Sequence, residues 1–366
     1  MSNRTSLSST GLPSPPATPS SETEIPYITG AAFIARRHEP PTTFEMGYWQ
    51  QRRRTLPVTD DVSQLDWCLA HPPATGRTHS TEIRCINILE TIRIGENHGA
   101  QIVLTADGYV AKLYDPLYYP FQNPSYPEET VDVTDAADKD YIREAAAYSE
   151  LLGTSLEGSI MPRYYGSWTL DIPVTIDAQT HLREVRMNIL EHVPGTLMHG
   201  VDPATITYEE RENIMIKLIE ADIELRFAGV RHGDLEPRNV ILSLPDSSTT
   251  YADPNLRLCI IDYGLCTLSK DRGLKGPAPQ LYNPLHYWTG CESWSQWGWS
   301  PGKEEAIEWM WSTWGNGGKE GKYVPTERDP DSKLGKPKRP VFADSRRRRV
   351  LAEQEVGSRV LQQHHH

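Results

Sequence analysis

Three stretches in the middle of the chain alternate apolar and polar residues, or run apolar, as β-strands do. They are INILETIRI (86–94), AQIVLTADGYVAKLYD (100–115) and VRMNILEHV (185–193), all containing Val or Ile. Asp107-Gly108 supplies a turn signal inside the second stretch and divides it into a hairpin. Later in the chain, NVILSL (239–244) and LRLCIIDYGL (256–265) predict two further strands.

Two helices are predicted from apolar stripes at helical spacing. The first, in residues 135–153, ends at Gly153, a residue that suits a helix C-terminus, and carries Glu144 on its apolar stripe of Tyr141, Ala145, Tyr148 and Leu152. The second begins with Thr207 and Glu210 in a T-x-x-E capping box and ends before Gly229. Its apolar stripe consists of Ile214, Leu218, Ala221, Leu225 and Ala228.

Tryptophans are crowded together between residues 283 and 315. They are Trp288, Trp294, Trp297, Trp299, Trp309, Trp311 and Trp314. Such crowding is typical of a small helical core or capping subdomain, and also of an aromatic surface on which bases or sugars stack. We favour the core.

The ends of the chain differ in composition from this central part. Residues 1–25 are rich in Ser, Thr and Pro and predict a disordered tail. Residues 26–85 predict an N-terminal extension whose short apolar pieces pack on a neighbouring element. Residues 326–366 predict a basic flexible tail, and its last residues His364, His365 and His366 are typical of a purification tag.

Charge and length limit the classes of protein to which this chain can belong. The chain has 366 residues, enough for one large domain or two lobes, and a formal net charge of −12, which argues against a protein that mainly coats nucleic acid. It has neither a run of about 18 apolar residues nor a secretory signal, so we expect a cytoplasmic protein with no membrane partner. Its five cysteines are widely spread and predict reduced thiols.

The residues that carry chemistry follow the second helix, in GVRHGDLEPRNVIL (229–242). His232-Gly233-Asp234, then Asn239, an apolar strand and Asp262-Tyr263-Gly264 form the order H-x-D-x-x-x-x-N followed by D-x-G. This order resembles the catalytic loop and metal-binding turn of the protein-kinase-like superfamily. The resemblance implies that Asp234 accepts or orients the substrate proton, that His232 braces the loop, and that Asn239 and Asp262 hold Mg²⁺ on the phosphates of ATP.

The resemblance extends upstream. YVAK ends at Lys112, where kinases keep the lysine that contacts the phosphates, and Glu144 lies on the next helix, where the partner of that lysine belongs. NILEHVPG (188–195) is similar to the last N-lobe strand and hinge, which implies that backbone groups of Glu191 to Val193 meet adenine. The implied fold is α+β and two-lobed, with an antiparallel sheet in the N-lobe (86–193) and a reduced helical C-lobe (194–325).

The chain departs from regulated protein kinases at four places. Gly233 replaces the arginine that grips a phosphorylated activation loop, as in aminoglycoside and choline kinase relatives and small fungal kinase-like proteins. Glu236 stands where a lysine neutralises the transferred phosphate, and a carboxylate there repels phosphate unless Arg238 or Mg²⁺ compensates. No G-x-G-x-x-G is present, only Gly95 and Gly99, and no A-P-E element follows Asp262.

Three hypotheses about function follow. The first is an ATP-dependent phosphotransferase that acts on a small molecule. The second is a kinase-like fold recruited to biosynthesis, for example one that resembles the tRNA-dependent, arginine-containing cyclodipeptide synthases. In that case basic side chains would grip the tRNA backbone, although such runs also suit a solvated tail: Arg52, Arg53, Arg54, Lys336, Lys338, Arg339 and Arg346 to Arg349. The third is a non-catalytic pseudokinase.

Overall fold

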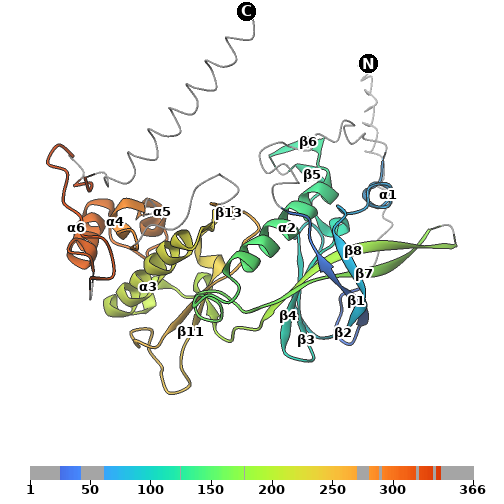
Figure 1. Ribbon diagram of the computed structural model, residues 1–366, viewed down its shortest axis with the longest axis horizontal. Helices are drawn as coiled ribbons and strands as arrows, with labels where there is room; N and C mark the ends of the chain where they lie inside the picture. The colour runs from blue at the N-terminus through green and yellow to red at the C-terminus, as the bar shows by residue number, and fades with distance from the viewer. Residues whose placement is uncertain are drawn as a thin grey trace, which may run out of the picture.

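The computed structural model describes residues 25–42, 62–123, 125–176, 178–269, 280–287, 291–318, 321–332 and 335–338. It has a mixed α+β fold with a large antiparallel sheet and several helices. In Figure 1 the sheet lies at one end of the molecule and helices α3 to α6 at the other. We call these parts the barrel region (residues 25–193) and the helical region (residues 194–338).

The large sheet closes into a six-stranded barrel with the order β1-β2-β3-β4-β8-β7. Its neighbouring strands are antiparallel. The strands predicted over 86–94, 100–115 and 185–193 are confirmed, and Gly108 makes the β3–β4 turn with a φ of 80°. The barrel strands are β1 (Ala32–Glu39), β2 (Arg77–Arg93), β3 (Gln101–Thr105), β4 (Tyr109–Tyr114), β7 (Tyr164–Ile176) and β8 (Gln179–Glu191).

The N-terminal segment belongs to this barrel. Strand β1 pairs with β2 on one side and β7 on the other, and β2 runs without a break through the boundary expected after residue 85. The barrel region also contains α1 (Gln64–Ala70), η1 (Pro116–Tyr118) and a small hairpin of β5 (Gln122–Asn123) and β6 (Tyr126–Thr130). Closure of the barrel therefore requires residues that the sequence pattern did not assign to the sheet.

Helix α2 (Val133–Leu151) connects the cores of the two regions. Tyr141 packs in a cluster on the barrel side, whereas Tyr148 and Leu151 pack with the core of the helical region. The buried stripe is confirmed for Tyr141, Ala145 and Tyr148, but the prediction for Leu152 is wrong, since its side chain is 56% exposed. The reason is that Leu152 is the C-cap and leaves the helical path before Gly153 turns the chain at a φ of 74°.

Helix α3 (Tyr208–Phe227) is the central element of the helical region. Its predicted capping box is confirmed, because Glu210 N–H donates to Thr207 Oγ1 and Thr207 N–H donates to Glu210 Oε2. Ile214, Leu218, Ala221 and Leu225 are buried, whereas Ala228 is partly buried. The shorter helices around α3 are η2 (Met198–Gly200), η3 (Pro203–Thr205), η4 (Pro237–Asn239), α4 (Pro284–Tyr287), α5 (Cys291–Gln296) and α6 (Lys303–Trp314).

Two small sheets complete the helical region. The predicted strands are confirmed as β11 (Val240–Ser243) and β12 (Arg257–Ile260), which form a three-stranded sheet with β9 (Thr196–Leu197). A second pair joins β10 (Val230–Arg231) to β13 (Thr267–Leu268). These sheets fix the chain on either side of the loop from His232 to Asn239, which we call the HGD loop, and they also fix the segment that carries Asp262.

The tryptophans of the helical region form mainly a core. Trp294, Trp299 and Trp314 are buried, whereas Trp297 is 38% exposed. Trp314 Nε1 donates to Glu220 at 3.1 Å, which satisfies its only polar group. The core interpretation therefore fits Trp294, Trp299 and Trp314, and Trp288 lies outside the described residues.

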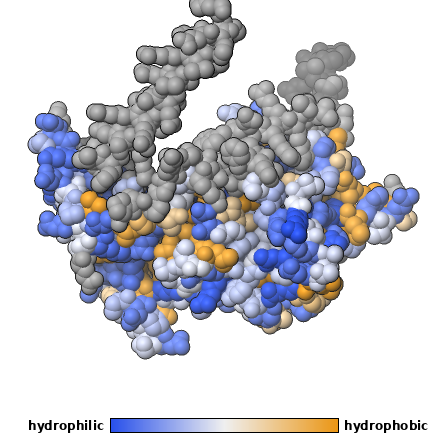
Figure 2. All heavy atoms as spheres, in the orientation of Figure 1, coloured by the Kyte–Doolittle hydropathy of each residue, from blue (hydrophilic) through white to orange (hydrophobic). Residues whose placement is uncertain are grey.

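On the face seen in Figure 2, hydrophobic side chains form several small groups among hydrophilic ones. No helix among the described residues is long and apolar enough to cross a membrane. Several predictions lie outside the described residues: the tail up to residue 24, the basic Arg52 to Arg54, and the tail from Arg339 onward with Arg346 to Arg349 and His364 to His366.

Candidate active site

The site lies where α2 meets the helical region. Strand β4 supplies Lys112, α2 supplies Glu144, the loop after β10 supplies His232 to Asn239, and the segment after β12 supplies Asp262. These residues come from positions up to 150 apart in the sequence. The structure thus brings together the polar residues that the sequence order singled out.

Lys112 occupies the centre of the site. Its Nζ lies 2.5 Å from Glu144 Oε2 and 2.8 Å from Asp262 Oδ1. Burial lowers the pKa of Lys112, but the Asp262 and Glu144 carboxylates more than offset this, so the pKa is raised and the ammonium stays charged. A buried charge without a partner lowers the stability of the folded state by several kcal/mol. Lys112, Glu144 and Asp262 therefore depend on one another.

The two carboxylates of this unit have different environments. Burial raises the pKa of Glu144, whose Oε2 also accepts from Tyr114 Oη at 2.6 Å. The Lys112 charge instead lowers the pKa of Asp262 to about 2, so this carboxylate is ionised at neutral pH. The Asp262 side chain keeps 36% of its surface exposed, whereas Glu144 keeps 1%. Asp262 is therefore the carboxylate that can meet a ligand, and Glu144 positions the lysine.

His232 joins the HGD loop to the Asp262 segment. It is buried, its Nε2 lies 2.9 Å from Ile261 O, and its Nδ1 accepts from Asp234 N–H at 3.3 Å. One neutral tautomer, with the proton on Nε2, makes both bonds, and burial accordingly lowers the pKa of His232. Ile261 N–H donates to Asn239 O at 2.9 Å, a second link between the same segments. His232 is a positioning residue.

Asp234 and Asn239 face each other within the loop. Asn239 Nδ2 donates to Asp234 O at 2.8 Å and to Asp234 Oδ2 at 3.0 Å. Because its amide nitrogen is bound in this way, Asn239 has its Oδ1 left to act as a ligand. The segment after β12, which carries Asp262, turns sharply. Asp262 has a φ of 66°, an uncommon value for a residue with a side chain.

Gly233 is required by close packing as well as by its φ of 85°. A Cβ at this position would lie 2.2 Å from Leu265 O, which is shorter than any real contact. An arginine therefore cannot be accommodated here without moving the Asp262 segment. The close packing of the HGD loop against the segment that carries Asp262 and Leu265 therefore requires glycine at position 233.

Arg238 compensates for Glu236. Its Nη1 pairs with Glu236 Oε2, and its Nη2 donates to Asp234 Oδ1 at 3.0 Å and Oδ2 at 2.9 Å. The Arg238 side chain is 54% exposed, so its guanidinium remains accessible from solvent. The repulsion expected from Glu236 is thus reduced by a cation held between the two carboxylates.

The turn between β2 and β3 replaces a Gly-rich loop. The buried side chain of Gln101 donates to Gly95 O at 3.0 Å and Gly99 O at 2.9 Å, and accepts from Gly95 N–H at 2.7 Å. Gly99 has a φ of 70° and packs near Tyr119. The altered loop is therefore closed on itself by one side chain. Sequence reasoning missed Gln101, and a polar residue at the first position of an apolar strand was the available signal.

Asp140 is a further acid that sequence reasoning missed. It lies one helical turn before Glu144, and its Oδ2 accepts from Tyr119 Oη at 3.2 Å. Burial raises its pKa to about 6, with Lys112 acting in the opposite direction. Its i, i+4 spacing from Glu144 was visible in the sequence, but helical spacing alone did not show that this face meets Asp262.

Glu191 and Val193, the residues expected at the hinge, lie at the end of β8 and directly after it. The Glu191 carboxylate accepts from Arg257 at 2.7 and 3.0 Å and from Arg163 N–H at 2.9 Å, while its own N–H donates to Arg163 O. Val193 is buried, with 6% of its surface exposed. The Glu191 side chain therefore has a structural role, and an adenine contact would depend on backbone groups of this segment.

The chain was compared with protein families, curated protein sequences and solved structures. No protein-family model and no curated protein sequence matches the chain. Among solved structures, the Rio2 kinase–ADP/Mg²⁺–phosphoaspartate complex from Chaetomium thermophilum is similar with a TM-score of 0.32 and 17% identity over 51% of this chain. The alignment also covers 51% of that protein, about half its length. The likeness to this kinase fold is weak.

Proposed function

We propose that this chain has a two-lobed protein-kinase-like fold and is a Mg-ATP-dependent phosphotransferase whose acceptor is a small molecule. The observation that carries the proposal is the buried Lys112 ammonium between Glu144 and Asp262, beside a loop that presents Asp234 and Asn239. Phosphoryl transfer depends on positioning and on charge stabilisation more than on covalent chemistry of the protein. A fixed cation, an ionised carboxylate and a loop with a second carboxylate supply these two requirements.

Each residue has a role that its contacts support. The Lys112 ammonium would bind phosphate oxygens, and Glu144 would hold that ammonium in place. Asp234 would accept or orient the proton of the acceptor hydroxyl. Arg238, which already contacts both oxygens of Asp234, would offset negative charge near the transferred group.

The residues present fit a magnesium ion bound together with nucleotide phosphates. Mg²⁺ is usually held by one or two protein oxygens plus phosphates and water, and Asp262 with the Asn239 Oδ1 would supply two such oxygens. No group of three or more His, Cys, Asp or Glu that could hold a metal is found among the described residues. When bound, the ion would neutralise charge on the phosphates.

Packing at Gly233 argues against a protein kinase that is regulated through a phosphorylated activation loop. The contact with Leu265 O excludes an arginine that could bind a phosphorylated activation loop. Regulation by such a phosphate is therefore not expected, and the A-P-E element of protein kinases is also missing from the sequence.

No specific observation favours either of the other two hypotheses. For the tRNA-dependent alternative, the arginine runs lie outside the described residues, and in the described part of the basic run Lys338 pairs with Glu327 at 2.6 Å. The pseudokinase alternative rests on the altered Gly-rich loop and on Glu236. Gln101 closes that loop, and Arg238 pairs with Glu236. Both the altered loop and Glu236 therefore have a structural explanation that does not require loss of catalytic function.

The decisive experiment combines ligand binding with product detection. We expect millimolar Mg-ATP to raise the melting temperature of the wild-type chain, since a ligand that binds only the folded state stabilises it. Lys112→Met should abolish this shift, while Asp246→Asn, an exposed loop carboxylate, should leave it unchanged. Metabolites of a heterologous host that expresses the chain should include a phosphorylated product that is lost with Asp234→Asn, with product formation reduced by about 100-fold or more.

Two results would contradict the proposal. One is the absence of any Mg-ATP-dependent stabilisation of the wild-type chain. The other is an unchanged metabolite profile in the Asp234→Asn strain when the variant protein is folded and binds Mg-ATP.

A further inference from the structure

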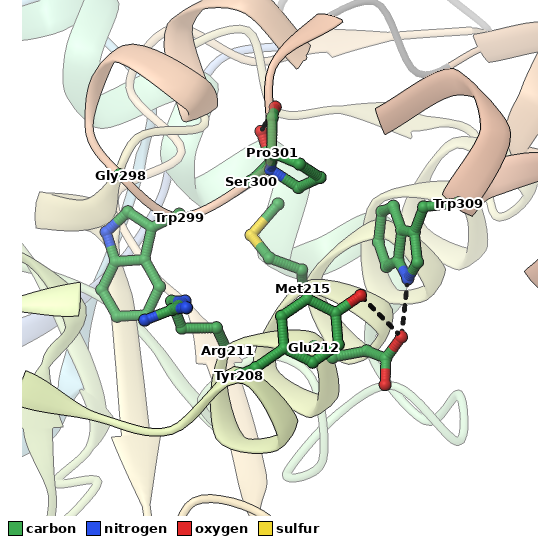
Figure 3. A pocket seen from close by; sticks show the side chains of 9 residues that line it. All are labelled: Tyr208, Arg211, Glu212, Met215, Gly298, Trp299, Ser300, Pro301 and Trp309. Carbon is green, nitrogen blue, oxygen red and sulfur yellow. Dashed lines mark hydrogen bonds between the residues drawn. The ribbon is translucent and has the colours of Figure 1, made fainter. Parts of the chain in front are cut away.

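A cavity lies in the helical region at the opposite end of α3 from the HGD loop. Helix α3 has 20 residues, so its two ends are separated by about 30 Å at a rise of 1.5 Å per residue. The cavity has a volume of about 140 Å³ and is lined by the first turns of α3, residues 298–301 and α6 (Figure 3). It is separate from the proposed phosphotransfer site.

Aromatic rings and a methionine side chain form most of the walls of this cavity. Figure 3 shows Trp299 and Trp309 on opposite sides, with Met215 between them and Tyr208 at the lower edge. Trp299 and Met215 are 4% and 2% exposed and form a fixed wall, whereas Tyr208 is 58% exposed at the opening. The Trp309 indole N–H donates to Glu212 Oε1 at 2.9 Å, which fixes the orientation of that ring.

Two opposite charges are also held at fixed positions in this cavity. Glu212 Oε1 accepts from Trp309 Nε1 and from Tyr208 Oη at 3.4 Å, so both of these contacts fall on the same oxygen and Oε2 remains for another donor. Arg211 Nη1 donates to Pro203 O at 2.6 Å and to Ile206 O at 3.1 Å, which leaves Nη2 to donate elsewhere. Figure 3 shows Arg211 on the side of Trp299 and Glu212 below Trp309.

We propose that this cavity binds a small zwitterion that carries a methylated ammonium and a carboxylate. The ammonium would lie against the faces of Tyr208 and Trp309 with Glu212 as its counter-ion, because aromatic faces attract such cations. The carboxylate would accept from Arg211. A neutral apolar ligand would desolvate both fixed charges without pairing them, and a ligand with one charge would leave either Arg211 or Glu212 unpaired.

The test is calorimetric titration of the full chain with three probes. Glycine betaine carries both charges, tetramethylammonium only the cation, and acetate only the anion. We expect glycine betaine to bind, and each single-charge probe to bind at least about 10-fold more weakly, because each lacks one ionic contact.

Variants locate the binding. Glu212→Gln keeps an oxygen that accepts from Trp309 but removes the charge, and should weaken glycine betaine binding about 10-fold or more. Tyr208→Ala, at an exposed position, should weaken it by a few-fold through loss of one aromatic face. Glu209→Gln, the exposed neighbour on α3, is the matched control and should leave the affinity unchanged.

Each other outcome overturns the proposal. Absence of heat with all three probes would exclude this ligand class, and tetramethylammonium binding as tightly as glycine betaine would exclude the role of Arg211. Unchanged affinity in both Glu212→Gln and Tyr208→Ala would place the ligand elsewhere. If Glu212→Gln fails to fold, Tyr208→Ala decides alone. The Mg-ATP thermal shift of these variants should equal that of wild type, which separates this proposal from the proposed phosphotransfer.

Discussion

The barrel region and the helical region are stabilised by different kinds of interior. Of the described residues that are polar or charged and buried, thirteen lie in the barrel region, from His38 to Asn188, and four lie in the helical region: Asp222, His232, Asn239 and Asn283. The helical region has an apolar core of Leu, Ile, Met and Trp side chains around α3, whereas the barrel region combines its buried polar groups with apolar clusters of its own. The comparison teaches that buried ion pairs and hydrogen bonds add to apolar packing in the barrel, whereas the helical region depends mainly on packing.

The Asp115 cluster shows what this means for the barrel. Asp115 is fully buried, pairs with the Arg183 guanidinium through both of its oxygens and accepts from Tyr27 Oη at 2.7 Å. These residues come from the N-terminal segment, the end of β4 and β8. One buried carboxylate therefore ties together three distant parts of the chain.

The largest effect is expected from Asp115→Ala. It leaves the Arg183 charge buried without its partner, so the free energy of unfolding should fall by about 3–5 kcal/mol. Equilibrium urea denaturation measures this change. Asp171→Ala is the matched control, since the Arg36–Asp171 pair is partly exposed, and should cost about 0–1 kcal/mol. Equal losses in both variants would show that burial of the pair does not matter.

A slightly smaller effect is expected in the core of the helical region. Leu218 on α3 is fully buried among apolar side chains, so Leu218→Ala should cost about 3 kcal/mol through lost transfer free energy and the cavity left behind. The loss should be the same at low and high salt, because no charge is involved. Leu182→Ala, at a position that is 65% exposed, should change stability by less than about 0.5 kcal/mol. A salt-dependent loss at Leu218 would contradict the apolar account of this region.

The smallest effect is a pH dependence of the barrel. Burial, with a smaller contribution from Arg186, lowers the pKa of His38 from 6.5 to about 3. Between these values the unfolded chain binds a proton that the folded chain does not, so stability is complete above pH 6.5 and falls as the pH is lowered. This group should remove about 2 kcal/mol between pH 7 and pH 5.

Denaturation of His38→Gln at both pH values tests this expectation. The variant should lose about 2 kcal/mol less stability on acidification than wild type does. His181→Gln, at an exposed position on β8, should behave like wild type. A His38→Gln curve that falls as steeply as the wild-type curve would show that other groups cause the acid sensitivity.

Much of the local structure and most of the proposed site were predictable from the sequence. Alternation predicted β3, β4 and β8, the T-x-x-E pattern predicted the start of α3, and the order of Lys112, Glu144, Asp234, Asn239 and Asp262 predicted residues that the structure brings together. Such signals are local, because they arise from hydrogen bonding and apolar periodicity within a few residues. The implied two-lobed kinase arrangement and the proposed activity stay proposals.

Tertiary structure decided the features that depend on residues far apart in the sequence. Strand β1 joins the barrel through β2 and β7, and Gly233 is fixed by Leu265. Periodicity likewise did not show that the helix face of Asp140 meets Asp262, or that a cavity lies between α3 and α6. The sequence determined the helices and strands with a clear periodicity and the order of the polar residues. Only the packing of those elements decided which charges are paired, because burial and distance set the energy of a charge.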